Sequence, residues 1–452
     1  MTTFASDRSG TTTLSTLHSA WRLRFRPLEL LDSLPDKGKV VRFKIGRHQV
    51  YMLTDPTMVR ELLVSQGKNA PKAGVMFDNA RAFLGNGLIT SNGTFHLRQR
   101  RLLQPAFQPG AVAGYAGIMS QAITERTESW RDGQTLAMQD ELFQLTQTVA
   151  SRCLFSVDPT GHMVDEISEW VPVLEKGVGR RTLLPIDLLY RLPTPGNRRY
   201  QTAVRRLDWL ISQIIRSYRE SGANHGDLLS MLVAARDETT GEPMSDRQIH
   251  EECLSLFIAS VETTARAMSW VLYLLGNHPD VEAGVHAEVD EVLCGRAAKH
   301  EDIARLPYLR QVVTETLRLY PPAWLLPRKA AVDIDLDGYR IPAGSEIFTS
   351  PYLVHRDEKV YPEPAKFDPD RWAPERARLI PRESYLPFGA GARQCIGNTF
   401  AFTEIMLWLG TLAGRWRMRP APGRKVRVRA MTVLYPDPLP MIASRRAAGR
   451  PR

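Results

Sequence analysis

A single cysteine, placed between a glycine-rich loop and a helix, is the feature that most constrains this chain. Cys395 lies near the end of the stretch FGAGARQCIG, residues 388–397, and apolar residues return every three or four positions after Asn398, which predicts a helix. The thiol therefore stands at a helix N-terminus, where unpaired amides and the helix dipole lower the pKa of a thiol and favour the thiolate. Gly389 and Gly391 let the backbone approach a flat ligand closely.

A cation close to the cysteine adds a second element of chemistry. Arg393 precedes Cys395 by two residues, and its guanidinium suits the carboxylate of a ligand. A thiolate, a closely approaching backbone and a carboxylate clamp together describe an axial ligand site for haem. A lone cysteine is more often a small buried hydrophobe, so this interpretation depends on the complete pattern around it.

The complete pattern is Phe-x-x-Gly-x-Arg-x-Cys-x-Gly, and it resembles the haem-binding signature of the cytochrome P-450 family. The resemblance implies that Cys395 is the metal ligand of haem b (iron protoporphyrin IX). The cofactor-binding residues implied by the signature are Phe388, Gly391, Arg393, Cys395 and Gly397.

The resemblance extends over about residues 40–444 and implies the fold. We expect a mainly α protein with small β-sheets, the cytochrome P-450 fold, in which a triangular helical prism surrounds a buried haem. Residues 1–20 are typical of a flexible polar arm, and residues 21–452 are expected to form a single domain. Strands are predicted at residues 40–45 and 50–53, around Ile334 and Ile347, and near Arg427 and Pro440, with a turn at residues 436–438.

Composition excludes several other classes of protein. A hydrophobic content of 43% and a charged content of 24% are ordinary for a globular protein. The formal net charge is +10, but the basic residues are scattered and form no basic-aromatic module. We therefore expect no nucleic-acid binding and a positive surface for an acidic protein partner. The four cysteines lie far apart, without metal-binding spacing. With no apolar stretch long enough for a membrane anchor, we expect a cytoplasmic protein.

A buried helix with polar residues at its centre is the second informative stretch. Residues 245–275 are largely apolar and begin with a serine, a plausible N-cap, yet Glu262 and Thr263 lie in the middle. Buried polar groups need partners or a function, and bonding of threonine to the preceding turn is the structural alternative. Residues 259–264 resemble the family's oxygen-activating segment, which implies that Thr263 and Glu262 are catalytic and deliver protons. Ser260 stands where the family usually has glycine.

A basic helix is predicted just after residue 94. His96 and Arg100 are four residues apart and share one face, whereas Arg98 and Arg101 share another. Basic faces are usually only solvated. The pattern His-x-x-x-Arg resembles the family's helix that contacts the haem propionates, which implies cofactor binding by His96 and Arg100. Arg98 and Arg101 are predicted to face an electron-donor protein.

A charge pair further along resembles a structural element of the family. Glu315 and Arg318 are three residues apart on a predicted helix that ends at Pro321, and such a pair alone is weak evidence. The resemblance implies that Arg371 joins them in a buried triad. We expect these three residues to be structural and not catalytic.

The candidate substrate pocket is apolar. Residues 323–328 resemble a pocket wall, with Arg328 as a third contact for the propionates. The glycine-rich residues 71–93 are expected to form a long irregular loop beside the site. Prolines interrupt residues 183–200, and the family resemblance implies that this region is a mobile lid over the substrate channel, with an ordinary loop between helices as the alternative. The candidate pocket residues, which imply a hydrophobic substrate, are Phe77, Phe83, Ile258, Ala259, Trp324, Leu325 and Leu434.

The resemblance implies a monooxygenase that inserts one oxygen atom from O2 into a hydrophobic secondary metabolite. Electrons are expected from a ferredoxin or flavodoxin-type donor with its NAD(P)H reductase. Residues 190–199 resemble bacterial members that oxidise cyclised terpenes, so a terpenoid is the first choice and a macrocyclic polyketide the second. Two alternatives stay open: a peroxygenase or isomerase of the same fold that needs no external electrons, and a haem-binding sensor without turnover. The Glu262–Thr263 pair argues against the first.

Overall fold

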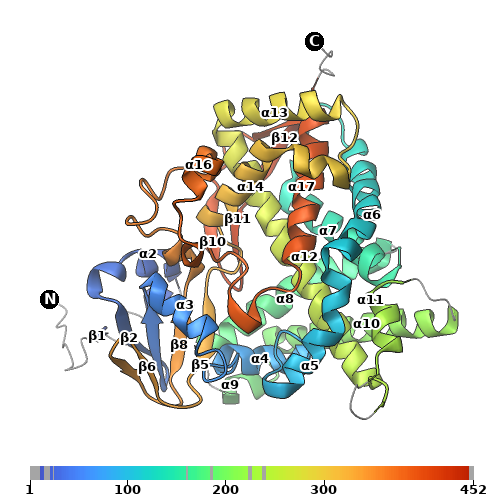
Figure 1. The fold of residues 1–452 in the computed structure, drawn as a ribbon. Helices are drawn as coiled ribbons and strands as arrows, with labels where there is room; N and C mark the ends of the chain where they lie inside the picture. The colour runs from blue at the N-terminus through green and yellow to red at the C-terminus, as the bar shows by residue number, and fades with distance from the viewer. Residues whose placement is uncertain are drawn as a thin grey trace.

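The computed structural model describes residues 11–14, 21–23, 25–158, 161–183, 187–221, 226–236 and 241–446. Helices make up most of the described chain, and the sheet that includes the N-terminal strands lies at one side of them (Figure 1). The helices of the described residues are α2 (Pro27–Asp32), α3 (Pro56–Val64), α4 (Val75–Leu84), α5 (Gly93–Leu103), α6 (Pro109–Glu128), α7 (Met138–Phe155), α8 (Gly161–Leu183), α9 (Asp187–Arg191), α10 (Pro195–Ser221), α11 (Leu228–Ala234), α12 (Asp246–Asn277), α13 (Pro279–Leu293), α14 (Pro307–Leu319), α15 (Pro351–Val354), α16 (Pro374–Ala377) and α17 (Asn398–Arg415).

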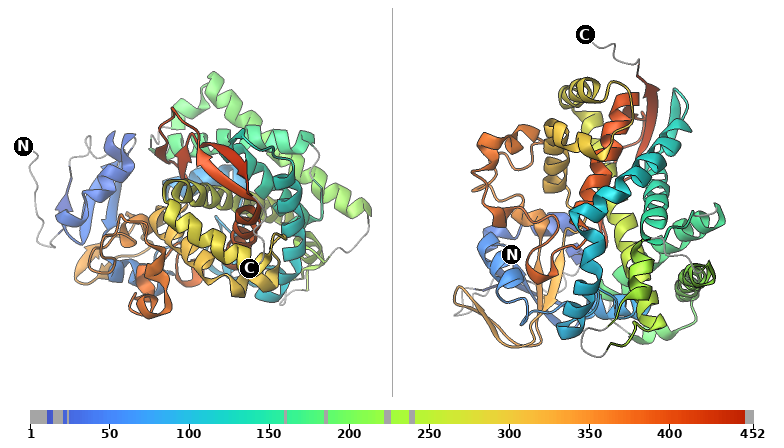
Figure 2. Two further views of the ribbon diagram at one scale, coloured as in Figure 1. Left: turned by 90° about the horizontal axis from the view of Figure 1, so that it is seen from above. Right: turned by 45° about the vertical axis from the view of Figure 1, so that its right-hand side comes forward.

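Four small sheets accompany the helices within the described residues. Their strands are β1 (Thr12–Thr13), β2 (Val40–Ile45), β3 (His48–Leu53), β4 (Gln134–Ala137), β5 (Leu326–Lys329), β6 (Ile334–Leu336), β7 (Tyr339–Ile341), β8 (Glu346–Thr349), β9 (Trp416–Pro420), β10 (Arg427–Ala430), β11 (Leu434–Asp437) and β12 (Pro440–Arg445). The largest sheet has the order β1-β2-β3-β8-β5, and it joins N-terminal strands to strands from the middle of the chain. Figure 2 shows the strands of this sheet in blue and orange and the C-terminal strands in red.

The predicted hairpin at residues 40–53 is present. β2 and β3 are antiparallel, with Val40 opposite Leu53, and Gly46 occupies the left-handed region at φ 58° in the turn. Buried residues alternate with exposed ones toward the end of β2, as expected for a strand with one covered face. Of the arm expected at residues 1–20, residues 1–10 and 15–20 lie outside the described residues, and Thr12–Thr13 pair in parallel with β2.

The long helix α12 crosses the middle of the molecule (Figure 1) and contacts α7, α10, α14 and α17. Ser245 is its N-cap and forms a capping box with Gln248: the Gln248 amide donates to Ser245 Oγ at 3.3 Å, and the Ser245 amide donates to Gln248 Oε1 at 3.2 Å. Both orphan amides are thereby satisfied. The buried helix predicted from the apolar sequence is confirmed.

Two stretches differ from the sequence expectation. Residues 71–93 are not one irregular loop, because α4 forms within them between Gly74 at φ 95° and Gly85 at φ 64°. The glycines mark the two ends of a short amphipathic helix that buries Phe77 and Leu84. The turn predicted at residues 436–438 also begins later than expected, because Pro436 and Asp437 pair with β10 as part of β11.

The proline-rich residues 183–200 are interrupted as predicted. α8 ends at Leu183, the short α9 follows, and α10 begins at Pro195. Pro195 stands at the first helical position, where its missing N–H costs no hydrogen bond. Residues 184–186 lie outside the described residues.

Candidate active site

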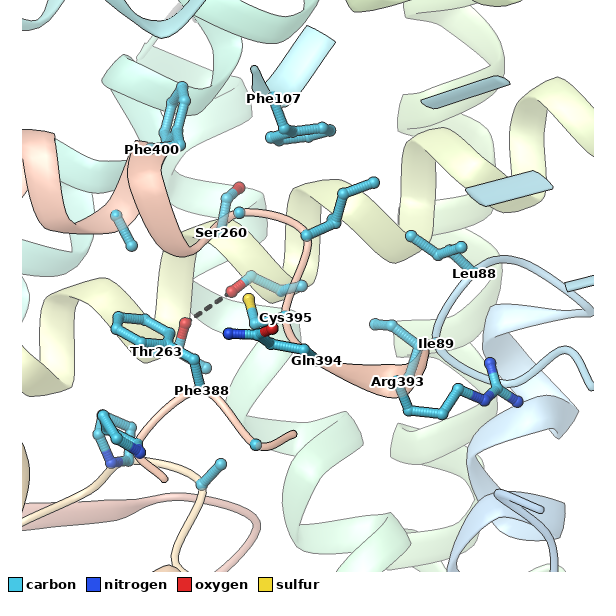
Figure 3. A pocket seen from close by; sticks show the side chains of 18 of the residues that line it. Leu88, Ile89, Phe107, Ser260, Thr263, Phe388, Arg393, Gln394, Cys395 and Phe400 are labelled. Atoms are coloured by element: carbon cyan, nitrogen blue, oxygen red, sulfur yellow. Dashed lines mark hydrogen bonds between the residues drawn. The ribbon is translucent and has the colours of Figure 1, made fainter. Parts of the chain in front are cut away.

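An internal cavity of about 260 Å³ lies between α12 and the loop that precedes α17. Figure 3 shows Thr263 and Cys395 among the side chains that line it. The predicted site residues that the structure brings together at this cavity are His96, Arg100, Ala259, Thr263, Arg328, Phe388, Arg393, Cys395 and Gly397.

The loop that carries Cys395 is held by its own backbone and by α3. The Cys395 amide donates a hydrogen bond to the carbonyl oxygen of Phe388 at 2.9 Å. Gly391 has φ 68°, and a Cβ there would lie 2.3 Å from the carbonyl oxygen of Leu63, so no other residue fits. Gly397 differs: its φ is −89°, and a Cβ placed there would come no nearer than 3.9 Å to another residue, the Phe107 ring. The glycine at 397 therefore leaves the cavity wall bare for a ligand and relieves no clash.

The thiol itself departs from the expectation of a lowered pKa. The Cys395 side chain is open to the cavity, yet the protein packed around it raises its pKa above the ordinary value, although a hydrogen bond from the Gly397 amide and the charges of Lys72 and Arg100 act in the opposite direction. The helix terminus therefore does not outweigh the loss of water. A coordinated metal ion, which deprotonates a thiol outright, would supply the stabilisation that these groups leave incomplete.

Positive charge gathers on one side of the cavity. Arg100, Arg328 and Arg393, which the resemblance assigned to cofactor binding, line it together with Lys72, and His96 lies among them. Lys72 gave no sequence signal, because a lone lysine after a proline is ordinary at a surface. Burial, followed by the charges of the neighbouring arginines, lowers the pKa of Lys72 to about 7. In the described part of the chain, no Asp or Glu lines this cavity to balance the cluster.

Two atoms of this cluster lack protein partners. His96 Nε2 and Arg393 Nη1 are buried and have no hydrogen-bond partner among the described residues. Burial, together with the charge of Arg393, lowers the pKa of His96 to about 3, so its imidazole is neutral near pH 7. Buried charges are stable only when paired, so the cluster fits a ligand that carries carboxylates.

Hydroxyl groups from α12 line the cavity as well. Thr263 Oγ1 donates to the carbonyl oxygen of Ala259 at 2.8 Å, drawn as the dashed line in Figure 3, and Ser260 Oγ donates to Phe257 O at 2.9 Å. Both hydroxyls bond to the preceding turn, which satisfies each donor and leaves each oxygen able to accept. Thr264, which was not singled out as a site residue, also lines the cavity.

Glu262 lies on another side of α12. Its carboxylate is 3.5 Å from Arg266 Nη2, and the Arg266 guanidinium lies 4.4 Å from the centre of the Tyr435 ring. Burial raises the pKa of Glu262 to about 7, against the lowering effect of Arg266. Thr263 thus contacts the cavity directly, whereas Glu262 contacts Arg266.

The three residues of the expected buried triad are brought together away from the cavity. Arg318 donates from Nε and Nη2 to the two oxygens of Glu315, both at 2.8 Å, and neither side chain is exposed. Arg371 Nε lies 3.5 Å from Glu315 Oε1, and Trp372 Nε1 donates to Glu315 Oε2 at 2.8 Å. Arg318 also donates to three backbone carbonyls. The cluster joins α14 to the segment that precedes the cysteine loop.

Most of the apolar residues proposed for the pocket pack elsewhere. Of the seven, Ala259 alone lines this cavity. Trp324 and Leu434 are buried in a separate apolar cluster, with Leu325 packed against it, while Phe83 and Ile258 pack against the main core. The apolar walls that sequence reasoning missed are formed by Leu88, Ile89, Phe107, Leu256, Ala267, Leu317, Pro322, Ala323, Leu326, Pro387, Ile396, Phe400, Ala401 and Ile405.

Comparison with known proteins identifies the family to which this chain belongs. The sequence profile of the family described as Cytochrome P450 matches residues 20–442. The chain belongs to the cytochrome P450 family. A solved structure of the cytochrome P450DA heme domain superposes on this P450 with a TM-score of 0.84 at 25% identity, covering 94% of each chain. The expected P450 fold, mainly α with small sheets, is therefore confirmed.

Three bacterial relatives match this P450 over nearly its whole length. Cyclooctatin synthase of Streptomyces melanosporofaciens is 44% identical over 92% of this chain and 91% of that protein. Cyclooctat-9-en-7-ol 5-monooxygenase of the same organism is 41% identical over 94% and 92%. Pentalenene oxygenase of Streptomyces avermitilis is 36% identical over 92% of both. This P450 is accordingly a haem-containing monooxygenase of hydrophobic small molecules that requires a redox partner. Among the described residues, no helix has both the length and the apolar composition to cross a membrane.

The residues present fit the haem of the family. Cys395 would supply a thiolate ligand to the iron, the bare backbone at Gly397 leaves room for a flat ring, and the arginines around Arg393, which no carboxylate of the cavity lining balances, suit propionates. When bound, a thiolate-ligated haem supplies the oxidising centre, because the thiolate donates electron density that favours O–O cleavage. The apolar walls exclude water, and the hydroxyls of Ser260 and Thr263 can accept and pass protons at their oxygens.

Proposed function

We propose that this P450 oxidises a terpenoid, with a cyclised terpene as first candidate. The observation that carries the proposal is the similarity, over at least 92% of this chain, to relatives named for pentalenene and for cyclooctat-9-en-7-ol. The apolar walls of the cavity, among them Leu88, Ile89 and Phe107, suit a compact hydrocarbon skeleton. A macrocyclic polyketide is the second candidate from the sequence, and no observation on the structure favours it.

Spectral titration of the purified haem-loaded protein tests this proposal. Pentalenene, cyclooctat-9-en-7-ol and a macrolactone of similar hydrophobicity are added separately, and the shift of the Soret band is recorded. We expect saturable shifts with the cyclic terpenoids at micromolar concentration and none with the macrolactone. Saturable binding of the macrolactone alone would overturn the terpenoid assignment.

We propose haem b as the cofactor, with Cys395 as axial ligand and Arg100, Arg328 and Arg393 as propionate contacts, assisted by His96. In support, all five line one cavity. Phe388 and Gly391 are proposed to form the supporting loop. A pyridine haemochrome spectrum after acid extraction distinguishes this non-covalent haem from a covalently attached one.

We further propose Thr263 as the proton-delivering residue and Glu262 as an indirect contributor. The hydroxyl of Thr263 lies at the cavity, whereas the Glu262 carboxylate lies beside Arg266. A proton from Glu262 therefore requires intervening groups or water. Glu315, Arg318 and Arg371 are proposed as structural residues, since their charges are paired with one another and with backbone groups.

The electron donor is proposed to be an acidic ferredoxin or flavodoxin-type protein with its NAD(P)H reductase, acting on a cytoplasmic enzyme whose residues 21–452 form one domain. Arg101 is exposed and Arg98 half-buried on α5, and Arg100 of the same helix donates to the Gln394 carbonyl beside Cys395 at 2.6 Å. A donor on this surface would lie close to the thiolate side. NAD(P)H-dependent product formation with such a donor excludes the sensor, and dependence on the donor excludes the peroxygenase.

A further inference from the structure

The short turn between α4 and α5 is hydrogen-bonded to the beginning of α12 through two neighbouring glutamate side chains. The Leu88 amide donates to Glu252 Oε2 at 2.8 Å, and the Asn86 amide donates to Glu251 Oε2 at 3.0 Å. The partners lie 164 and 165 residues apart in the chain. The consecutive residues Glu251 and Glu252 of α12 therefore accept hydrogen bonds from the amides of Asn86 and Leu88 in the same turn.

The turn also fits closely against α12. A Cβ at Gly87 would lie 2.3 Å from Ser255 Oγ and 2.6 Å from the carbonyl oxygen of Glu251. A Cβ at Gly85, which has φ 64°, would lie 2.3 Å from Glu251 Cδ. At Gly87 only glycine lets the turn approach the helix backbone, and at Gly85 the positive φ favours glycine.

Glu252 is an unusual group to find at this place. It is buried, at 1% exposure, and no Lys or Arg acts on its pKa, which burial raises to about 8 against the lowering effect of the Leu88 amide. Burial of an ionisable side chain costs free energy, which a hydrogen bond offsets only in part. An apolar residue would fill the space without that cost but could not hold an amide.

The turn that Glu252 holds carries part of the cavity wall. Leu88 and the next residue, Ile89, form part of the cavity wall, and Figure 3 shows both side chains at the cavity. Thr90 Oγ1 then donates back to the Gly85 carbonyl at 2.7 Å, which closes the turn on itself. The wall is therefore positioned by the hydrogen bond from the Leu88 amide to the Glu252 carboxyl group and not by packing of the apolar side chains alone.

We propose that Glu252 is a positioning residue that determines which substrates this P450 accepts, by holding Leu88 and Ile89 at the cavity. The inference rests on the proposed use of this cavity for substrate, but it does not depend on the substrate being a terpenoid. Loss of the acceptor lets the turn move, so bulky ligands lose their fit while ligands too small to touch the wall do not.

A pair of substitutions separates this role from a general structural one. Glu252→Gln keeps a carbonyl oxygen for the Leu88 amide, and Glu252→Met keeps the length without an acceptor. Haem-loaded proteins are titrated with 4-phenylimidazole and with imidazole, which bind haem directly whatever the natural substrate is. We expect Glu252→Met to weaken 4-phenylimidazole binding about tenfold, the typical effect of one buried hydrogen bond, with imidazole affinity unchanged and Glu252→Gln close to wild type.

Hydrogen exchange gives a second, ligand-independent measurement. The Leu88 amide should exchange faster in Glu252→Met than in Glu252→Gln, with exchange in α17 unchanged. The proposal is overturned if both variants bind the two azoles as wild type does, or if Glu252→Gln is impaired as much as Glu252→Met. If Glu252→Met does not fold, Leu88→Ala shortens the wall side chain and keeps the hydrogen bond between the residue 88 amide and Glu252. Unchanged selectivity between the two azoles in Leu88→Ala would then contradict the inference. A failed terpenoid titration would leave these outcomes unaffected.

Discussion

The carboxylate of Glu262 lies 3.5 Å from the guanidinium of Arg266, one turn further along α12. The ion pair turns the acidic member of the Glu262–Thr263 pair away from the hydroxyl that lines the cavity. Adjacent residues of a helix are rotated by about 100° from each other, so a sequence neighbour need not be a chemical neighbour. Proton delivery by these two residues must therefore be tested for each separately.

Replacement of Cys395 by His is expected to abolish the strongly red-shifted Soret band of the ferrous–CO complex, because that band requires thiolate ligation. The measurement is a CO difference spectrum of the dithionite-reduced protein. Cys294→Ser is the control, since Cys294 is exposed and distant in the chain, and it should keep the band. A red-shifted band in Cys395→His would identify another ligand.

Thr263→Ala is expected to lose much of its product while still consuming NAD(P)H, with hydrogen peroxide formed in place of product. General-acid contributions are typically about 10²–10⁴-fold. Ser260 lines the same cavity and could substitute, so the double variant Ser260→Gly, Thr263→Ala should be coupled still less well. Product and peroxide are measured per electron pair. Equal coupling in wild type and both variants would exclude this proton route.

The stability of the protein should depend on pH through Glu262. Burial raises its folded-state pKa to about 7 from the ordinary 4.5, so the folded protein binds the proton more tightly than the unfolded chain. The free energy of unfolding is therefore expected to fall as pH rises from 4.5 to 7, by up to about 3 kcal/mol from this group. Glu262→Gln should remove this part of the dependence. Parallel pH curves for the two proteins in urea melts would contradict it.

Glu315→Ala should give little soluble, haem-loaded protein. Removal of one member of a buried charge cluster leaves Arg318 uncompensated, at a cost of about 3–5 kcal/mol. The matched control is Asp333→Ala, which breaks an exposed ion pair with Arg340 at 2.6 Å and should change stability little, because solvent screens an exposed pair. The loss of stability is measured as the yield of haem-loaded protein and as the free energy of unfolding in urea. A stable, haem-replete Glu315→Ala that only turned over slowly would assign Glu315 to catalysis.

The double variant Arg98→Glu, Arg101→Glu should be reduced more slowly by an acidic donor at low ionic strength, because charge steers the encounter. Reduction of the wild type should slow as salt is added, and the variant should show little salt dependence. Arg424→Glu, Lys425→Glu changes the net charge equally on the exposed loop between β9 and β10 and serves as control. Stopped-flow reduction at the wild-type rate would remove the docking hypothesis.

The sequence by itself determined those features that depend on local interactions. The capping box of Ser245 spans three residues, and the pairing of Glu315 with Arg318 spans one helical turn. The Cys395 loop closes on Phe388 within seven residues. Each of these is a short-range interaction between residues that are close in the sequence. Residue type and position predicted the N-cap at Ser245, and spacing placed Glu315 beside Arg318 on one helix face.

The tertiary structure decided which further side chains meet at the cavity, besides those that the family resemblance implied. Lys72 joins the arginines, and Leu88 reaches the cavity wall, because long-range hydrogen bonds and glycine contacts bring residues 72–92 against α12 and the cysteine loop. Trp324, an equally plausible pocket residue in the sequence, packs elsewhere because its indole N–H donates to the Met431 carbonyl at 2.9 Å. Such partners lie about a hundred residues or more apart, and no local pattern specifies them.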